Sequence, residues 1–256
     1  MKGPEAAVLE QGSGTPVILV HGAPSSAAGW APIAERLARS AKVVTVIAPG
    51  YEGASPVEAD VVNAQERALL KATQKYGRAL WVGFSFGANR ILRWAAHKQI
   101  DPLALHSIGG FAFLPPEVRR GMKETAAFVR TLPDVKAEPV RGQFCAQMLS
   151  PKWAAAHPET LAEIGRWIDS TSTRVLADEL DFVADLEPYD LSAIKAPVVA
   201  RTGTADINVP PERSEHLKQL LPQTEVERVE GAAHALLIED VSGTADSILK
   251  LLKKVG

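Results

Sequence analysis

The residues best suited to chemistry lie in the pentapeptide Gly83-Phe84-Ser85-Phe86-Gly87. It has the G-x-S-x-G pattern, in which a serine stands on a sharp turn between a strand and a helix. Residues 79–82 before it predict a strand, and residues 88–97 after it predict a helix. The flanking glycines leave room for the strand and the helix to pack closely. This context favours Ser85 as a nucleophile over an ordinary serine in a glycine-rich turn, the alternative that the pentapeptide alone leaves open.

A serine hydroxyl is a poor nucleophile at neutral pH, so it needs a base, and the base needs a third group to orient it. Among the six histidines, His234 follows a predicted strand at residues 225–229 and a turn at Gly231. It also precedes the last predicted helix, so it should lie on a loop at the carboxyl edge of a parallel sheet, where such proteins bind their ligands. We expect His234 to be the base. The alternative is an unconnected surface histidine.

The orienting carboxylate should lie on a neighbouring loop of the same sheet edge. Asp206 follows a predicted strand at residues 196–201 and precedes His234 by 28 residues, which is about one helix and one strand. Asp185 and Asp190 lie at the opposite end of that strand. The loop after the predicted strand 102–108 begins Gly109-Gly110-Phe111 and has no carboxylate. Asp206 is therefore the expected acid, the alternative being an aspartate that caps its own turn.

A developing oxyanion needs backbone N–H donors. The N–H of Phe86, directly after the serine, is one candidate. The loop His21-Gly22-Ala23-Pro24 follows the predicted strand 16–20, and Ala23 is the expected second donor because Pro24 has no N–H. His21 is expected to be a buried residue that organises this loop.

The elements that must position these residues alternate along the chain. Short apolar runs at residues 16–20, 42–47, 79–82, 102–108, 196–201 and 225–229 predict strands. Helical patterns at residues 31–39, 57–76, 88–97 and 241–253, and after Pro211, separate them. Such alternation predicts an α/β fold with a mostly parallel central sheet and helices on both faces. From about residue 111 to residue 188 this alternation stops, and helical patterns broken by prolines take its place. This predicts a helical insertion.

The order of these pieces, from the oxyanion loop through Ser85 and Asp206 to His234, resembles the α/β-hydrolase superfamily over nearly the whole chain. Further similar segments are His21 to Ser26 with Trp30, Ala48 to Ser55, and Glu239-Asp240 after His234. One departure is Ala48, where many members carry aspartate; that position is usually structural. The resemblance implies an α/β-hydrolase core at residues 1–111 and 189–256, with a helical cap, or lid, at residues 112–188.

The resemblance also implies a lid-bearing serine carboxylesterase that cleaves small-molecule esters through an acyl-enzyme on Ser85. Members that are haloalkane dehalogenases or epoxide hydrolases carry aspartate in place of the serine. The same triad serves C–C hydrolases, lactonases, perhydrolases and aminopeptidases, and some receptors keep the triad without turnover, so these alternatives remain open. The residues expected to line the substrate pocket are Phe84, Phe111, Phe144 and Trp153.

The composition of the chain limits the kinds of partner and the cellular location that we expect. The 256 residues carry a formal net charge of −2 with 23% charged residues, which does not favour nucleic-acid binding. The single cysteine, Cys145, cannot form an internal disulfide or a cysteine metal cluster. The first residues lack a signal-peptide pattern, and no apolar run is long enough to cross a bilayer. We therefore expect a cytoplasmic protein with no membrane partner, no cofactor and no metal; the sequence does not indicate an oligomeric state.

Overall fold

The computed structural model describes residues 3–24, 27–132, 138–169 and 171–256. Within them, seven strands form one sheet in the order β1-β3-β2-β4-β5-β6-β7. Only β1 runs antiparallel, alongside β3; the other neighbouring strands pair in parallel. The strands are β1 Ala7–Gln11, β2 Pro16–Val20, β3 Lys42–Ile47, β4 Ala79–Phe84, β5 Pro102–Ile108, β6 Val198–Gly203 and β7 Thr224–Val229. This is the expected α/β fold with a mostly parallel sheet.

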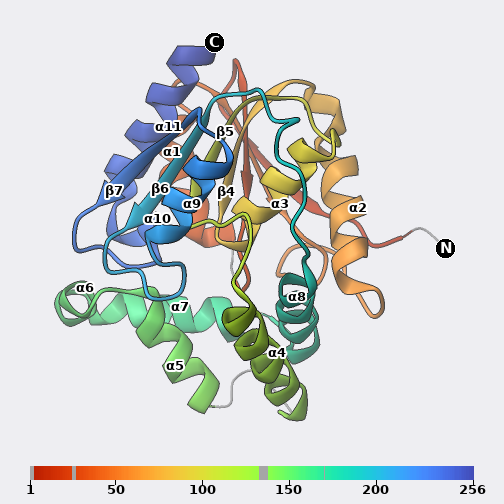
Figure 1. The fold of residues 1–256 in the computed structure, drawn as a ribbon, viewed down its shortest axis with the longest axis vertical. Helices are drawn as coiled ribbons and strands as arrows, with labels where there is room; N and C mark the ends of the chain where they lie inside the picture. The colour runs from red at the N-terminus through yellow and green to blue at the C-terminus, as the bar shows by residue number, and fades with distance from the viewer. Residues whose placement is uncertain (1–2, 25–26, 133–137, 170) are drawn as a thin grey trace.

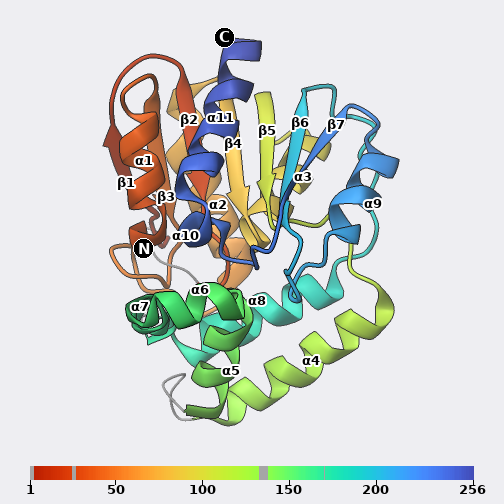
Figure 2. The same ribbon diagram turned by 90° about the vertical axis from the view of Figure 1, so that its left-hand side faces the viewer.

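Helices cover both faces of the sheet because its central strands are apolar on both sides. In β2, Val17 and Leu19 belong to one buried cluster, whereas Ile18 and Val20 belong to another. The first cluster includes residues of α1 (Ala31–Leu37) and α11 (Val241–Val255), and the second includes residues of α2 (Val61–Thr73), α3 (Phe86–Ala96) and α9 (Glu212–Leu220). Figure 2 shows α1 and α11 in front of the sheet and α3 behind it. The short elements are η1 Ala27–Trp30, η2 Gln74–Tyr76 and α10 Leu236–Glu239.

The predicted helical insertion corresponds to the chain between β5 and β6. Its helices in the described residues are α4 Pro116–Thr131, α5 Glu138–Met148, α6 Pro151–Ala156, α7 Pro158–Asp169 and α8 Thr173–Asp185. They lie together beyond the end of the sheet at which β4 and β5 finish (Figure 1). Ion pairs join α4 to α8 and to the residues just after α8: Arg130–Asp178, Lys123–Asp185 and Arg119–Glu187, at 2.7, 2.5 and 2.5 Å. Within the described residues, no helix is both long and apolar enough to cross a membrane.

Three differences from the sequence-based expectation have a clear physical reason or affect the Ser85 turn. The edge strand β1 was not predicted, because its short sequence Ala-Val-Leu-Glu-Gln does not alternate between apolar and polar residues, and it is held by pairing with β3. Helix α2 begins at Val61 rather than at residue 57, since Asp60 before it has a left-handed backbone with φ of 50°. Helix α3 begins at Phe86, two residues before the predicted start, which shortens the turn at Ser85.

A buried histidine in the sheet makes the stability of the fold depend on pH. His106 of β5 is fully buried, and its Nε2 lies 2.8 Å from the Ser247 hydroxyl of α11. Burial, and secondarily the charge of Arg201, lower the His106 pKa from 6.5 to about 3. The folded protein therefore keeps this imidazole neutral at pH values at which the unfolded chain protonates it.

We expect the free energy of unfolding to fall as the pH drops from 6.5 toward 3, because the unfolded state then binds one more proton at His106. The loss from this residue approaches about 1.4 kcal/mol per pH unit and is absent above pH 6.5. Urea unfolding between pH 7 and 5 should give a shallower pH dependence for His106→Gln than for the wild type. An equal dependence of the unfolding free energy on pH in the two proteins would show that His106 is not its source.

Candidate active site

The turn that carries Ser85 has an unfavourable backbone conformation. Ser85 has φ of 53° and ψ of −119°, outside the regions that non-glycine residues normally occupy. Its N–H donates to the carbonyl of Ile108 at 2.8 Å, and its own carbonyl accepts from the N–H groups of Ala88 and Asn89. These bonds tie the turn to β5 on one side and to α3 on the other. The half-buried Ser85 side chain therefore stands at the carboxyl edge of the sheet.

The two glycines of the pentapeptide are required by close backbone contacts. A Cβ at Gly83 would lie 2.5 Å from the Cα of Ala88 in α3. A Cβ at Gly87 would lie 2.3 Å from the carbonyl oxygen of Val20, at the end of β2. Real Cβ atoms do not approach backbone this closely, so strand, turn and helix can pack in this way only with glycine at both positions. This close packing explains why the G-x-S-x-G pattern has glycine on both sides of the serine.

Asp206 and His234, 28 residues apart in sequence, are hydrogen-bonded. The Nδ1 atom of His234 lies 2.7 Å from Oδ2 of Asp206, and both residues are nearly fully buried. The other carboxylate oxygen of Asp206 accepts the N–H groups of Asn208 and Val209 at 2.9 and 2.8 Å. Asp206 therefore accepts bonds from its own turn and is hydrogen-bonded to His234 at the same time; its role as the orienting acid stays a prediction.

His234 lies beside the Ser85 turn. Its ring packs against that of Phe84, the residue before Ser85, with centroids 5.0 Å apart. It also faces Gly109, where an added Cβ would lie 3.1 Å from ring atoms of His234. Gly109 follows Ile108, whose carbonyl binds the Ser85 N–H. Because Nδ1 is engaged by Asp206, Nε2 is the ring nitrogen left to act as a base.

The loop after β2 packs against the same turn. A Cβ at Gly22 would lie 3.1 Å from the Cβ of Ser85. His21 is buried; its Nε2 accepts the N–H of Ala48 at 3.0 Å, and its Nδ1 lies 2.7 Å from the Gly22 carbonyl. Burial, and then the charge of Arg90, lower the His21 pKa from 6.5 to about 4. A neutral His21 therefore holds the loop that presents Ala23.

The second candidate donor for an oxyanion is Phe86. It is the first residue of α3, so its N–H has no carbonyl partner within that helix. Its side chain lies in a small apolar cluster that also contains Phe111 and, at its margin, Ala23. The structure thus brings Ala23, Phe86 and Phe111 together around the Ser85 turn.

A buried ionic network lies beneath Phe86. The guanidinium of Arg90, one turn along α3, lies 4.1 Å from the centre of the Phe86 ring. Arg90 is fully buried and binds Glu66 of α2 and Glu179 of α8, at 3.0 and 3.2 Å. Burial raises the pKa of Glu179, and the Arg90 charge opposes that rise. Through Arg90, three helices are joined directly behind the Ser85 turn.

The four residues predicted to line a substrate pocket do not all pack together in the structure. Phe84 lies under the His234 ring and is almost fully buried. Phe111 belongs to the cluster with Phe86. Phe144 and Trp153 instead pack at the margin of the large core cluster, together with the interior of α5 to α7. Contact with substrate stays a prediction for all four.

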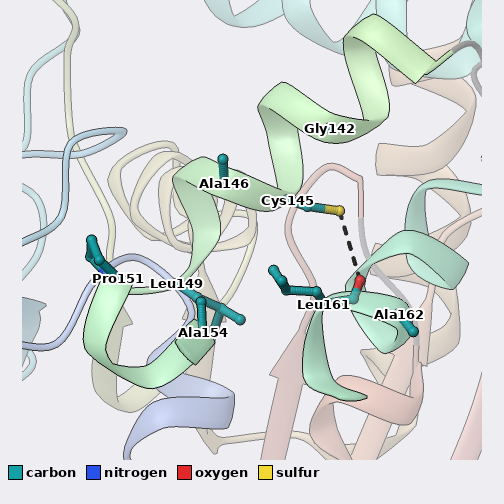
Figure 3. A pocket seen from close by; sticks show the side chains of 8 residues that line it. All are labelled: Gly142, Cys145, Ala146, Leu149, Pro151, Ala154, Leu161 and Ala162. Carbon is teal, nitrogen blue, oxygen red and sulfur yellow. Dashed lines mark hydrogen bonds between the residues drawn. The ribbon is translucent and has the colours of Figure 1, made fainter. Parts of the chain in front are cut away.

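The structure contains a cavity of about 540 Å³ among α5, α6 and α7, and none of Ser85, Asp206 and His234 lines it (Figure 3). Its lining is apolar and consists of Gly142, Cys145, Ala146, Leu149, Pro151, Ala154, Leu161 and Ala162. The Cys145 thiol points toward the carbonyl of Leu161, at 3.8 Å. Sequence patterns did not reveal this cavity, because small residues on short helices carry no signal of the space between them.

Other residues near the triad were also missed by sequence reasoning. The cluster around Phe86 and Phe111 contains Val62, Leu114, Phe182, Val183 and Val209, from four separate parts of the chain. Asn208, Ser150 and Glu239 make polar contacts at the same loops. None of these residues belongs to a recognisable sequence motif, except Glu239, which follows His234 in the segment similar to the α/β-hydrolase superfamily. Within the described residues, no group of three or more His, Cys, Asp or Glu side chains is arranged to hold a metal ion.

Comparison with known proteins agrees with this geometry. The profile of the alpha/beta hydrolase fold family matches residues 15–241, so the chain belongs to the α/β-hydrolase family. It is 23% identical over 248 residues to a pimeloyl-[acyl-carrier protein] methyl ester esterase of Vibrio vulnificus, covering 95% of this chain and 96% of that protein. It is 24% identical over 260 residues to the polyketide synthase ThaQ of Burkholderia thailandensis; that match covers 98% of the chain but only 12% of the synthase.

Among solved structures, a thermophilic esterase from Thermogutta terrifontis, bound to malate, superimposes with a TM-score of 0.87 at 21% identity. The match covers 98% of this chain and 94% of that one. At this level of identity the likeness establishes a shared fold, and the chemistry must be argued from the residues of this chain.

The packing at Gly87 leads to a prediction for stability. We expect Gly87→Ala to lower the free energy of unfolding by about 2 kcal/mol or more, since its Cβ would overlap the Val20 carbonyl. Gly121→Ala is the matched control, because a Cβ there meets nothing within 4 Å and Gly121 lies inside α4. Chemical denaturation should show that control unchanged or more stable by up to about 1 kcal/mol. Equal stability of Gly87→Ala and wild type would contradict the close packing of the turn.

Proposed function

We propose that this protein is a serine hydrolase that cleaves small-molecule carboxylic esters through an acyl-enzyme on Ser85. The observation that carries the proposal is the 2.7 Å bond between His234 Nδ1 and Asp206 Oδ2 beside the strained turn at Ser85. A buried, oriented imidazole next to a serine on such a turn meets the geometric requirements of nucleophilic acyl transfer.

In the proposed first step, the Ser85 hydroxyl attacks the ester carbonyl while Nε2 of His234 takes its proton. The carbonyl π electrons move to oxygen, and the N–H groups of Phe86 and Ala23 stabilise that oxyanion. Asp206 stabilises the imidazolium that forms. Its other oxygen keeps its bonds to Asn208 and Val209, so the carboxylate stays in place during the transfer.

In the second step the tetrahedral intermediate collapses. His234 returns the proton to the departing alkoxide, which leaves as an alcohol, and the acyl group remains on Ser85. A water molecule then attacks the acyl carbonyl, with His234 as the base, and the carboxylic acid leaves as Ser85 regains its proton. These steps use side chains and main-chain donors of this chain together with water.

The chain from 112 to 188 forms the proposed cap, and residues 1–111 and 189–256 form the proposed core. Two observations support this division: α4 to α8 lie together beyond the carboxyl end of the sheet, and α8 contributes Val183 to the apolar cluster at Phe86 (Figure 1). A cap in this position would exclude water from the acyl-enzyme. The curated relative that acts on a methyl ester matches over both parts, which also supports ester cleavage.

The substrate class follows from the surroundings of the turn. Phe111, Val183 and Val209 join Phe86 in an apolar cluster, which favours an ester with an apolar acyl or alcohol group. A carboxylesterase reaction on a small substrate is therefore preferred to cleavage of an amide in a charged peptide.

We expect Ser85→Ala to lower kcat by on the order of 10⁴- to 10⁶-fold on p-nitrophenyl acetate, because the nucleophile is removed. Ser192→Ala is the matched control; this exposed serine bonds Asp190 in a surface turn and should keep wild-type turnover. Near-normal turnover by a folded Ser85→Ala protein would refute the acyl-enzyme.

We expect His234→Ala to lower kcat more than Asp206→Asn, because the base accepts the proton whereas the acid orients the base. Asp206→Asn should keep the turn bonds to Asn208 and Val209, since an amide oxygen can still accept them. Steady-state kinetics on the same ester would test the order. Wild-type activity in Asp206→Asn would assign the orienting role to another residue.

A further inference from the structure

The joint between α5 and α6, residues 147–150, contacts both loops of the triad. Asn208 lies two residues after Asp206, and its side chain donates to the carbonyl of Gln147 at 3.0 Å. Ala235 directly follows His234, and its N–H donates to the carbonyl of Met148 at 2.8 Å. The proposed cap thus bonds directly to the acid loop and to the base loop.

Glu239 completes this contact from the core side. One carboxylate oxygen accepts the N–H of Ser150 at 2.5 Å, and the other accepts the Ser150 hydroxyl at 2.9 Å. That second oxygen also accepts the N–H of Ala233 at 3.3 Å. Ala233 directly precedes His234. The carboxylate therefore links the residue before the base to the first turn of α6, where Ser150 is the N-cap.

We propose that the Glu239 carboxylate and the 147–150 joint act together to hold the main chain on both sides of His234, and so keep His234 in its reactive orientation. The inference rests on the proposed serine hydrolase function and adds Glu239 and Ser150 to it as positioning residues. Neither residue contacts the reacting atoms.

The physical argument is that His234 is held from both sides along its own chain. Ala233 is fixed through Glu239, and Ala235 is fixed through Met148, so both neighbours of the base depend on the joint. Asp206 orients the ring itself, but a hydrogen bond to the ring does not fix the main chain that carries it. A shift of about 1 Å in a catalytic group can lower the rate by about 10²-fold. Loss of the joint should therefore lower the rate of the chemical step rather than substrate affinity.

The experiment compares Glu239→Ala, Glu239→Gln and Ser150→Ala with the wild type, using p-nitrophenyl acetate turnover and the rate of Ser85 labelling by diisopropyl fluorophosphate. Labelling reports nucleophile activation without a choice of natural substrate. We expect Glu239→Ala to lower kcat and the labelling rate by about 10- to 100-fold, with KM within about threefold of wild type. Glu239→Gln should recover only part of the loss, because its one amide oxygen can accept the N–H of Ser150 or that of Ala233, and its amide nitrogen can accept neither.

Ser150→Ala keeps the main-chain bond to Glu239 and should give a smaller loss, of about two- to fivefold in kcat. The double variant Glu239→Ala/Ser150→Ala should be no slower than Glu239→Ala alone, since both changes break one link. Asp185→Asn is the matched acid-to-amide control within the cap; it bonds Lys123 of α4 and should leave kcat and KM unchanged.

A merely structural role would give a different pattern. If Glu239→Ala lowered the melting temperature but kept wild-type kcat and labelling rate well below that temperature, the inference would be wrong. If Glu239→Ala failed to fold, wild-type kcat and labelling rates in both Glu239→Gln and Ser150→Ala would overturn the inference as well. Turnover that survives in Ser85→Ala would instead overturn the proposed function, so the two failures are distinguishable.

Discussion

The strained backbone at Ser85 is the constraint on which the rest of the site depends. A positive φ at a serine is tolerated only where surrounding contacts hold it, and here β5 and α3 bind the turn from both sides. The same turn requires glycines at 83 and 87, because backbone atoms of α3 and β2 occupy the places of their Cβ atoms. The strand β4, the turn at Ser85 and the helix α3 therefore form one closely packed unit, and the other predicted site residues are arranged around it.

Two sets of polar contacts connect this unit to the α4–α8 segment. Below it, Arg90 joins α3 to Glu66 of α2 and to Glu179 of α8 in a fully buried ionic network. Above it, Glu239 and the main chain at Met148 join the base loop to the start of α6. Removing one partner of a buried ion pair leaves an uncompensated charge, so the lower contact is costly to break. The upper contact consists of hydrogen bonds to the Glu239 carboxylate and of a main-chain bond between Ala235 and Met148. The proposed cap is thus held both at α8 and at the 147–150 joint.

Different parts of the molecule were predictable to different degrees. The strand that carries Ser85 and the fully buried strand β2 were visible in the sequence, because a central strand covered on both faces reads as a continuous apolar run. The edge strand β1 was not, since its half-exposed residues are strand-like only when paired with β3. The roles of Ser85, Asp206, His234, Ala23 and Phe86 follow from chain order and loop position, and they stay predictions until the variants are measured. Phe111 and Phe144, both expected to line the substrate pocket, belong to different apolar clusters, and their contact with substrate stays a prediction.

The sequence by itself determined the alternation of strands and helices, the glycine-flanked serine and the chain order of Ser85, Asp206 and His234. Each of these depends on the chemistry of a residue and its near neighbours, such as the missing Cβ of Gly83 and Gly87. Only the tertiary structure decided that Asp206 binds His234 while capping its own turn, that Arg90 lies beneath Phe86, and that Glu239 joins Ser150 to Ala233. Those contacts join residues from different elements, and several of them use main-chain N–H groups, which every residue except proline possesses and which therefore leave no trace in the sequence.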